Sequence, residues 1–323
     1  MNAKIQSKKN RTRLRMHFFA AGFLWATLVF FTSGCTSPST SASDIKTAED
    51  IPRAYGGKLR KRIGIAPFEV KTTHVDRFTR QIFQDLILDS VLAECPGIVF
   101  IKPGDWDYPS ILISLPRLEN GKIDNFQLAL IGRQLGLSAV VVGTLTSVST
   151  EERDWGFWIF KRIRYYVGVQ ILVEVYDTET ATKLLDRNVS REVEIDEADA
   201  EMLNRQSKIS VNFIEEVLEI IANVIDDHIC DVAEEQIWKS YIASTAGSEY
   251  LIASGRSSGL QPGHVLEVYD STQVIQGAQG HRYFKPGSKV GELKITTVDE
   301  EQSKAVTLSG DNLPQWSVVK IKK

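Results

Sequence analysis

The stretch from Asp226 to Cys230 reads Asp-Asp-His-Ile-Cys. Carboxylate, imidazole and thiolate groups are metal ligands, so this stretch is a candidate for metal chemistry. It lies in a predicted helix, where each residue turns the chain by about 100°. That spacing puts His228 within the apolar stripe and Cys230 on the opposite face, so the two side chains cannot bind one ion. We expect His228 to be a partly buried packing residue.

Other polar groupings also lack the geometry that catalysis needs. Adjacent acidic residues such as Glu234 and Glu235 diverge on a helix, which predicts solvated surface. The sequence Gly-Arg-Ser-Ser-Gly at 255–259 does not connect a strand to a helix, as a serine nucleophile elbow does. The glycine-rich stretches lack the Lys-Ser/Thr pair of a phosphate loop. The sequence therefore predicts a non-enzymatic protein without a metal or a cofactor.

The N-terminal region has the pattern of an export signal. Six basic residues precede Phe18, and no acidic residue occurs before Asp44. Residues 18–31 then form an uncharged run of fourteen residues, which is too short for a spanning helix of about 20 residues. A basic head, a short apolar middle and a small-residue end are typical of a secretory signal.

The sequence Thr32-Ser33-Gly34-Cys35 resembles the lipobox of bacterial lipoproteins. The resemblance implies cleavage between Gly34 and Cys35 and a lipid on the Cys35 thiol, with residues 1–34 as the signal. Thr36, where an aspartate would favour the inner membrane, implies the periplasmic face of the outer membrane. Residues 35–57 would then be the lipidated cysteine and a flexible tether. An uncleaved anchor, or cleavage at another small residue, remains an alternative.

The charge balance excludes one class of partner. The full chain has 38 basic and 41 acidic residues, a net charge of −3. Removal of residues 1–34 takes away six basic residues and no acidic ones, which leaves 32 against 41 and a net charge of −9. Such a chain has no basic patch large enough for phosphate contacts, so we expect no nucleic-acid partner.

Hydrophobic periodicity divides the mature chain in two. Residues 58–242 alternate strands and helices, which predicts a mixed sheet packed by helices, of the α+β or α/β class. The predicted strands are 62–70, 98–101, 139–149, 159–175 and 183–195, and the predicted helices are 78–93, 125–135 and 211–241. Residues 243–323 show short apolar runs separated by glycines, which predicts a small all-β barrel.

Two parts of the chain resemble known families. Residues 62–68, 128–148 and 169–189 resemble the strand, helix and turn motifs of the curli secretion lipoprotein family. Its superfamily includes the lipoprotein activator of a penicillin-binding protein and the N-terminal domain of TolB, with an anticodon-binding-like fold. Residues 255–308 resemble the SH3-like end domain of flagellar assembly protein T.

The resemblance implies a structural or assembly component of an envelope machine, flagellar-ring or secretion-associated. It also implies protein partners and a homo-oligomer or ring, besides the membrane contact of the lipid anchor. A lipoprotein adaptor that regulates a peptidoglycan synthase is the alternative. A curli-type export channel is a third, and it is disfavoured because the one candidate spanning segment, 150–161, carries four consecutive charges at 151–154.

The sequence Asp-Trp-Gly-Phe-Trp-Ile-Phe at 154–160 lies at a predicted hairpin tip, where small polar residues are usual. Two interpretations stay open. The aromatic side chains could pack on the domain's own helices. Alternatively they form a contact patch for a neighbouring subunit, a partner or the lipid surface, made of Trp155, Phe157, Trp158 and Phe160.

Cys95 and Cys230 are the two cysteines left after lipidation of Cys35. An oxidising periplasm permits a disulfide between them, provided that the turn at Cys95 covers the face of the helix that carries Cys230. Free thiols, or a bridge between two chains through Cys230, are the alternatives.

The anchor is tested by the substitution Cys35→Ser. Because the serine hydroxyl is not a substrate for thiol lipidation, we expect loss of labelling by a fatty-acid probe. The protein should also leave the outer-membrane fraction when envelopes are separated by density. Unchanged labelling of the variant would contradict the lipoprotein prediction.

Overall fold

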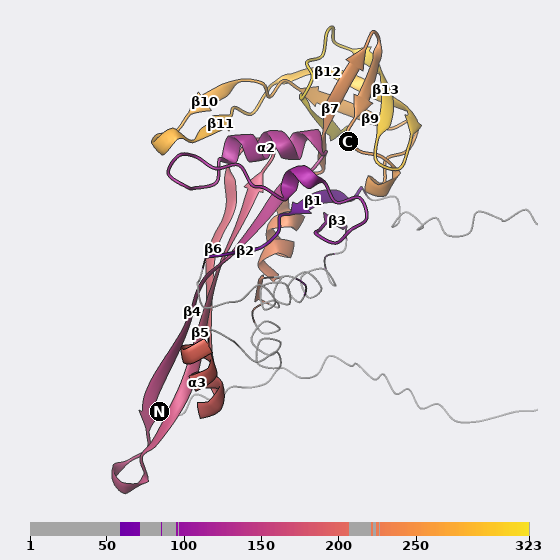
Figure 1. The fold of residues 1–323 in the computed structure, drawn as a ribbon. Helices are drawn as coiled ribbons and strands as arrows, with labels where there is room; N and C mark the ends of the chain where they lie inside the picture. The colour runs from indigo at the N-terminus through magenta and orange to yellow at the C-terminus, as the bar shows by residue number, and fades with distance from the viewer. Residues whose placement is uncertain are drawn as a thin grey trace, which may run out of the picture. The chain divides into compact units, whose positions relative to one another are not determined.

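The structure is a computed structural model, and it describes residues 59–71, 85, 95, 97–206, 221, 224–225 and 227–322. A mixed sheet and a closed barrel make up most of this part of the chain (Figure 1). The predicted class, a mixed sheet with helices followed by a small all-β barrel, is confirmed at that level. The finer likeness to an anticodon-binding or SH3-like fold stays a prediction.

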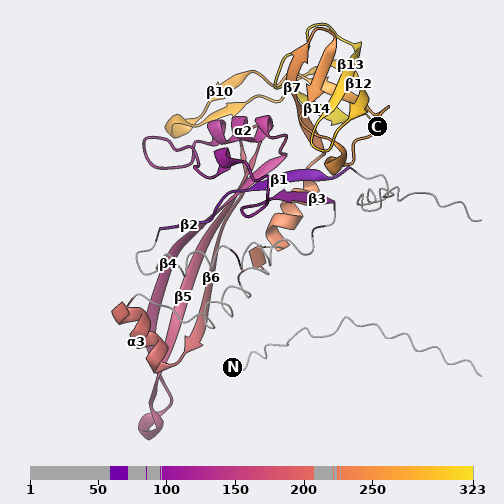
Figure 2. The same ribbon diagram turned by 45° about the vertical axis from the view of Figure 1, so that its right-hand side comes forward.

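The sheet has six strands in the order β3-β1-β4-β5-β6, with β2 beside β4. Strands β1, β2 and β3 run parallel to their neighbours, whereas β4, β5 and β6 are antiparallel. The strands are β1 (Lys61–Ile65), β2 (Glu69–Val70), β3 (Ile98–Ile101), β4 (Ala139–Trp155), β5 (Arg162–Asp177) and β6 (Lys183–Ile195). Figure 2 shows β4, β5 and β6 extending together far beyond the short strands.

Each face of the sheet has its own core because strand side chains alternate between faces. Odd-numbered residues of β5, such as Val169, Ile171 and Val173, pack against α3 (Glu197–Gln206) and the helical residues 227–235. On the other face, Val140 and Tyr176 pack against α2 (Asn125–Gln134) and η1 (Ser110–Leu112).

The barrel is closed in the order β12-β13-β8-β7-β14-β9. Its strands are β7 (Lys239–Ala246), β8 (Glu249–Ile252), β9 (Val265–Tyr269), β12 (Lys289–Val298), β13 (Ser303–Ser309) and β14 (Val318–Ile321). Closure leaves no edge strand, which suits a module with a small core. The short helix η3 (Arg256–Ser258) lies between β8 and β9.

A two-stranded ribbon leaves the barrel between β9 and β12 and lies along α2 (Figure 1). Its strands are β10 (Val274–Gln276) and β11 (Arg282–Phe284), joined through η4 (Ala278–Gly280). The Phe284 ring stacks on Phe126 of α2 with centroids 4.6 Å apart. His281 Nδ1 lies 2.8 Å from Asn125 Oδ1. The ribbon therefore attaches the barrel to the sheet module.

Three sequence predictions need correction or lie outside the described residues. The helix predicted for 211–241 ends at residue 235, because Trp238 and Ile242 belong to the barrel core and the chain is already extended from Lys239. The barrel thus starts before the predicted boundary at 242/243, and Gly247 and Ser248 form the turn between β7 and β8. The helix predicted for 78–93 lies outside the described residues except for the helical Asp85.

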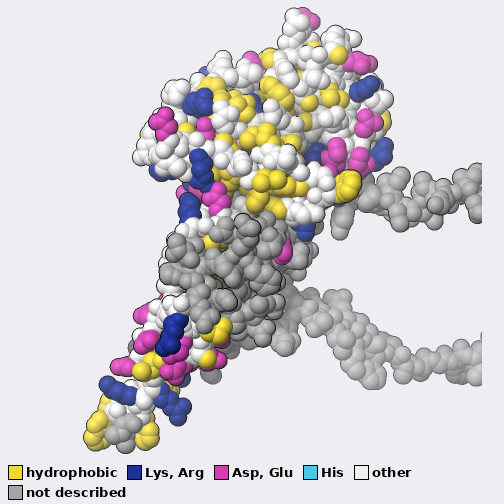
Figure 3. All heavy atoms as spheres, in the orientation of Figure 1, with side chains coloured by type: hydrophobic (Ala, Val, Ile, Leu, Met, Phe, Trp, Pro, Cys, Tyr) yellow, Lys and Arg dark blue, Asp and Glu magenta, His cyan; other side chains and the backbone are white. Residues whose placement is uncertain are grey.

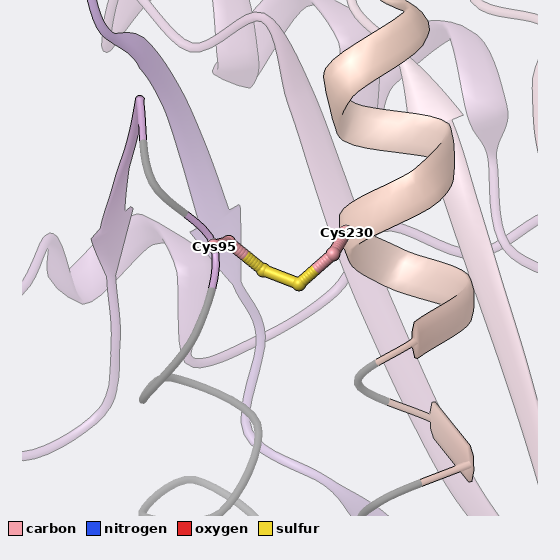
Figure 4. Close-up of a disulfide and its surroundings, with 2 residues drawn as sticks. All are labelled: Cys95 and Cys230. Atoms are coloured by element: carbon pink, nitrogen blue, oxygen red, sulfur yellow. A yellow bond between two sulfur atoms is a disulfide. The ribbon is translucent and has the colours of Figure 1, made fainter. Parts of the chain in front are cut away.

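A disulfide joins Cys95 to Cys230 (Figure 4). It connects the turn before β3 to the helical residues that lead into the barrel, and the two Cα atoms are 5.5 Å apart. The Lys61 ammonium donates hydrogen bonds to the carbonyls of Ala233 and Glu234 in the same region. These contacts hold the end of the helix against β1.

Loss of the disulfide should destabilise the fold measurably. It closes a loop with a sequence separation of 135 residues, and such a cross-link stabilises by about 2–5 kcal/mol through the unfolded chain. We expect Cys230→Ser to lower the midpoint of chemical unfolding. Reduction of the wild-type protein should give the same decrease and should leave the variant unaffected. A reduced wild type that unfolds at the original midpoint would contradict this.

Candidate functional site

The hairpin of β4 and β5 positions the predicted contact residues. The two strands pair from Ala139 opposite Asp177 to Trp155 opposite Arg162, with one register shift after Leu145. β6 and α3 support the middle of this hairpin, where Thr150 Oγ1 lies 2.5 Å from Asn204 Oδ1. The last residues of the hairpin extend past both elements (Figure 1).

The turn at the end of the hairpin depends on one glycine. Gly156 has φ of +111°, a conformation that residues with a Cβ rarely adopt. A Cβ there would also approach the Phe160 carbonyl oxygen. Trp158 follows at φ of +53° and starts the short helix η2 (Trp158–Phe160). The backbone therefore turns tightly, and it presents bulky rings where turns usually have small side chains.

The four predicted aromatic residues are exposed to solvent. The exposed fractions are 54% for Trp155, 84% for Phe157, 79% for Trp158 and 75% for Phe160. The interpretation that these rings cover the domain's own helices is therefore wrong, because buried rings would have small exposed fractions. We name these four residues the tip patch. Exposed apolar clusters of this kind mark contact surfaces in many proteins.

Charged side chains follow the tip patch in two layers. Figure 3 shows hydrophobic side chains at the end of the hairpin, Lys and Arg next to them, and Asp and Glu farther along. The Arg164 guanidinium lies 3.9 Å from the Trp155 ring centroid and 2.9 Å from Glu194. Among the described residues, exposed Lys161 and Arg162 have no ion-pair partner. Exposed Asp154 lies at the same end and offsets one of these two charges, so the tip presents aromatic rings beside a small excess of positive charge.

The Arg153 side chain joins the basic layer to the acidic one. It lies 2.5 Å from Glu151 and 2.9 Å from Glu192. The hydrogen bond from Arg153 lowers the pKa of the Glu151 carboxyl below its ordinary value. All three side chains are substantially exposed, so these pairs contribute little to folding stability. They mark where the basic side chains near the tip give way to the acidic side chains farther along the hairpin.

A polar cleft of about 770 Å³ lies on the α2 side of the sheet. Four cationic and two acidic side chains line it, namely Lys71, Arg117, Lys122, Lys183, Glu174 and Asp186. Much of this charge is paired internally, since Lys183 lies 2.5 Å from Glu174 and 2.8 Å from Asp186. None of the predicted contact residues lines the cleft. Its charges do not select one class of ligand.

A buried charge cluster joins the sheet to the barrel. The Arg133 guanidinium, from α2, donates to the carbonyls of Thr178, Glu179 and Ser271 at 2.9, 2.5 and 3.2 Å. It also lies 3.5 Å from the Phe284 ring centroid. Arg133 is only 1% exposed, so these contacts replace its hydration. The sequence offers one signal for this role: Arg133 follows Phe126 and Ala129 on the buried face of the helix.

The Lys239 ammonium completes this charge cluster. It forms an ion pair with Asp177 and lies 3.5 Å from Glu179, and Lys320 of β14 lies 2.8 Å from Glu179. Sequence reasoning missed the whole cluster, because its members come from α2, the β5–β6 turn, β7 and β14. Asp-Thr-Glu-Thr at 177–180 lies between the predicted strands 159–175 and 183–195, and by itself it predicts only a turn.

The other predicted residues lie elsewhere. Gly34 and Cys35 are outside the described residues, so cleavage and lipidation stay predictions. His228 is half-buried. In the part of the chain that the structure describes, no group of three or more His, Cys, Asp and Glu side chains could hold a metal ion. No helix in that part is long and apolar enough to cross a membrane.

Comparisons with known proteins show similarity only among solved structures. No family model and no curated protein matches the chain. A hypothetical protein from Chlamydia trachomatis has a TM-score of 0.32 and 9% identity, over 54% of this chain and 99% of that one. A lipoprotein from Neisseria meningitidis has a TM-score of 0.28 and 12% identity, over 52% and 99%. TolB from Acinetobacter baumannii has a TM-score of 0.25 and 12% identity, over 79% of this chain and 61% of that one.

Similarity at this level carries no argument about family or function. The resemblances named from the sequence therefore stay predictions. The tip patch remains the candidate site, because its geometry rests on the chain's own residues.

The charge cluster predicts how the protein responds to acid. Burial raises the pKa of Asp177, but the Lys239 charge and hydrogen bonds from Lys239 and Thr180 outweigh it and hold that pKa below its ordinary value. A lowered pKa stabilises the fold fully above the unfolded value of about 3.9. This stabilisation is lost as the pH falls through the folded value. We expect the free energy of unfolding to decrease below about pH 4.

The variant Asp177→Asn isolates this contribution. Since it leaves the buried Lys239 ammonium with Glu179 at 3.5 Å as its remaining carboxylate partner, it should cost about 3 kcal/mol at pH 7 and give a shallower loss below pH 4. The control is Asp186→Asn, whose side chain is 58% exposed in its pair with Lys183. Denaturant titration from pH 7 to pH 2 measures both variants. Equal stability of the two at pH 7 would contradict the role of the buried pair.

Proposed function

We propose that this chain is a non-enzymatic lipoprotein of the bacterial cell envelope that acts as a structural or assembly component of an envelope machine. A lipid on Cys35 would hold it at the periplasmic face of the outer membrane, and it would assemble with protein partners, in a homo-oligomer or ring. The observation that carries the proposal is the tip patch, four aromatic side chains that are each more than half exposed.

The construction of the molecule supports a mechanical role for this patch. One end of the β4–β5 hairpin is attached to the barrel by buried charges and by the ribbon on α2. The other end presents the rings to solvent. A rigid support with an apolar end suits a contact between protein subunits. The finer assignment to a flagellar or secretion-associated ring rests on the sequence resemblance and is part of the proposal.

Replacement of Trp155, Phe157 and Trp158 by serine tests the proposal. Because the rings are exposed, the thermal midpoint should hardly change, whereas each buried aromatic would cost about 3–5 kcal/mol. If the wild-type protein assembles as proposed, native gels of detergent-solubilised envelopes should show it in large complexes. We expect the serine variant to be absent from such complexes. The matched control replaces Ile237, Ile275 and Leu308, which are 64%, 51% and 51% exposed, by serine.

The control variant should keep both its midpoint and its complexes. A tip variant that melts early would show that the rings stabilise the fold. A tip variant that melts normally and still assembles would remove the tip patch from the proposed function.

A further inference from the structure

A second exposed apolar surface lies in the loop between β3 and α2. Trp106 is 102% exposed, and Ile111 and Ile113 are 45% and 60% exposed. We name these three residues the loop patch. Figure 3 shows hydrophobic side chains on the surface below the barrel, beside a group of Asp and Glu side chains. Neither the buried charge cluster nor the polar cleft involves the loop patch.

The loop holds Trp106 outward by defined contacts. The Asp105 carboxylate accepts a hydrogen bond from the Lys102 backbone N–H at 2.7 Å, and the Asp105 N–H donates to the Lys102 carbonyl. The Tyr108 hydroxyl donates to the Ile65 carbonyl at 2.9 Å, and Leu112 is fully buried. The exposed indole therefore sits on a fixed support. Tryptophan in such a position is typical of an anchor residue in protein interfaces.

One chain cannot bring its own two patches together. The loop begins directly after Ile101, which pairs with Gly64, and Gly64 pairs with Val140 near the start of β4. The tip patch begins at the other end of that strand. A strand rises about 3.3 Å per residue, so the two ends of β4 are about 50 Å apart. Continuous pairing with β5 keeps the hairpin extended.

The charges beside the two patches are opposite. The tip exposes Lys161 and Arg162 against one carboxylate, Asp154, whereas Asp105 and Asp107 flank Trp106. Asp107 is exposed and has no ion-pair partner among the described residues. Contact between two tips would bring together two surfaces with a net positive charge, which like-charge repulsion opposes. Contact between a tip and a loop would bring opposite charges together.

We propose that the tip patch of one copy of this chain binds the loop patch of a second copy. This inference rests on the proposed function, since it names the partner of the tip patch. Four aromatic side chains of this exposure offer on the order of 600 Å² of apolar surface. A specific interface buries about 800 Å² per partner, so the tip supplies most of one side.

The contact is heterologous, because each copy contributes a different surface. After pairing, the copy that contributed its tip keeps a free loop, and the copy that contributed its loop keeps a free tip. Repetition of such a contact gives a ring if the rotation closes and a filament if it does not.

Site-specific cross-linking in envelopes tests the contact. Two tagged full-length copies are expressed together, one with Trp106→Cys and the other with Phe157→Cys, and the envelopes are treated with a short bismaleimide. Cys95 and Cys230 form a disulfide and do not react. We expect a mixed dimer that carries both tags. The control pairs Phe157→Cys with Leu308→Cys, a barrel residue that is 51% exposed, and should give no product.

Three outcomes would overturn the inference. A dimer of two Phe157→Cys copies without the mixed product would show a tip–tip contact. Absence of any dimer, with the Phe157→Cys thiol protected by vesicles of anionic phospholipid, would assign the tip to a membrane. Equal product from the Leu308→Cys control would show random collision.

The cross-linking experiment and the experiment with the serine variant test the two proposals independently. If the tip serine variant loses its complexes but the mixed dimer never forms, the proposed function stands and the loop patch is not the partner. If the mixed dimer forms while the complexes survive the serine variant, the tip contact is real but dispensable for assembly.

Discussion

The ion pair between Lys239 and Asp177 sets the relation between the two parts of the fold. Asp177 is the last residue of β5, and Lys239 is the first residue of the barrel. Both side chains are about 95% buried, so each charge depends chiefly on the other to offset its lost hydration, with Glu179 beside Lys239 and Thr180 beside Asp177. Arg133 and Lys320 extend the same network to α2 and β14. A barrel placed elsewhere would lose these ion pairs and hydrogen bonds.

This network gives the long hairpin a fixed origin. From Val175 back to Val167, every second residue of β5 packs into the core between the sheet and its helices. The rest of the strand, toward Arg162, extends beyond that core. Charged residues are usually exposed and aromatic residues are usually buried, and the two ends of the β4–β5 hairpin reverse this rule. Charges are inside at the cluster, where every one has a partner, and aromatic rings are outside at the tip, where none is covered. The buried charges fix one end of the hairpin, and the exposed rings make the other end apolar, which suits an element that carries a contact surface away from the rest of the protein.

The elements with strong local periodicity could be predicted from the sequence. β3 and β6 begin and end at the predicted residues, and α2 differs by one residue. The exposed tip aromatics also follow from the sequence, since rings in a turn break a local rule. The end of the helix at residue 235 could not be predicted, because apolar residues continue into the barrel without a glycine or proline between.

Features that depend on contacts between distant parts of the chain could not be predicted from the sequence. Arg133 lies in an apolar helix sequence, and only the carbonyls of Ser271 and Glu179 explain why it is buried. Trp106 gives the opposite case, since a tryptophan in a loop usually predicts burial. Its exposure follows from the neighbouring contacts of Tyr108 and Leu112, which occupy the space beneath.

The disulfide also bears on how the chain matures. Its two cysteines are 135 residues apart, so an exported chain would present Cys35 and Cys95 to an oxidant before Cys230 emerges. Those first two thiols could form a non-native bridge. In the proposed lipoprotein, acylation of Cys35 removes that sulfur from redox chemistry and leaves a single pairing. The lipid would then act as a protecting group as well as an anchor, and a chain that escaped acylation would be at risk of misfolding as well as of release.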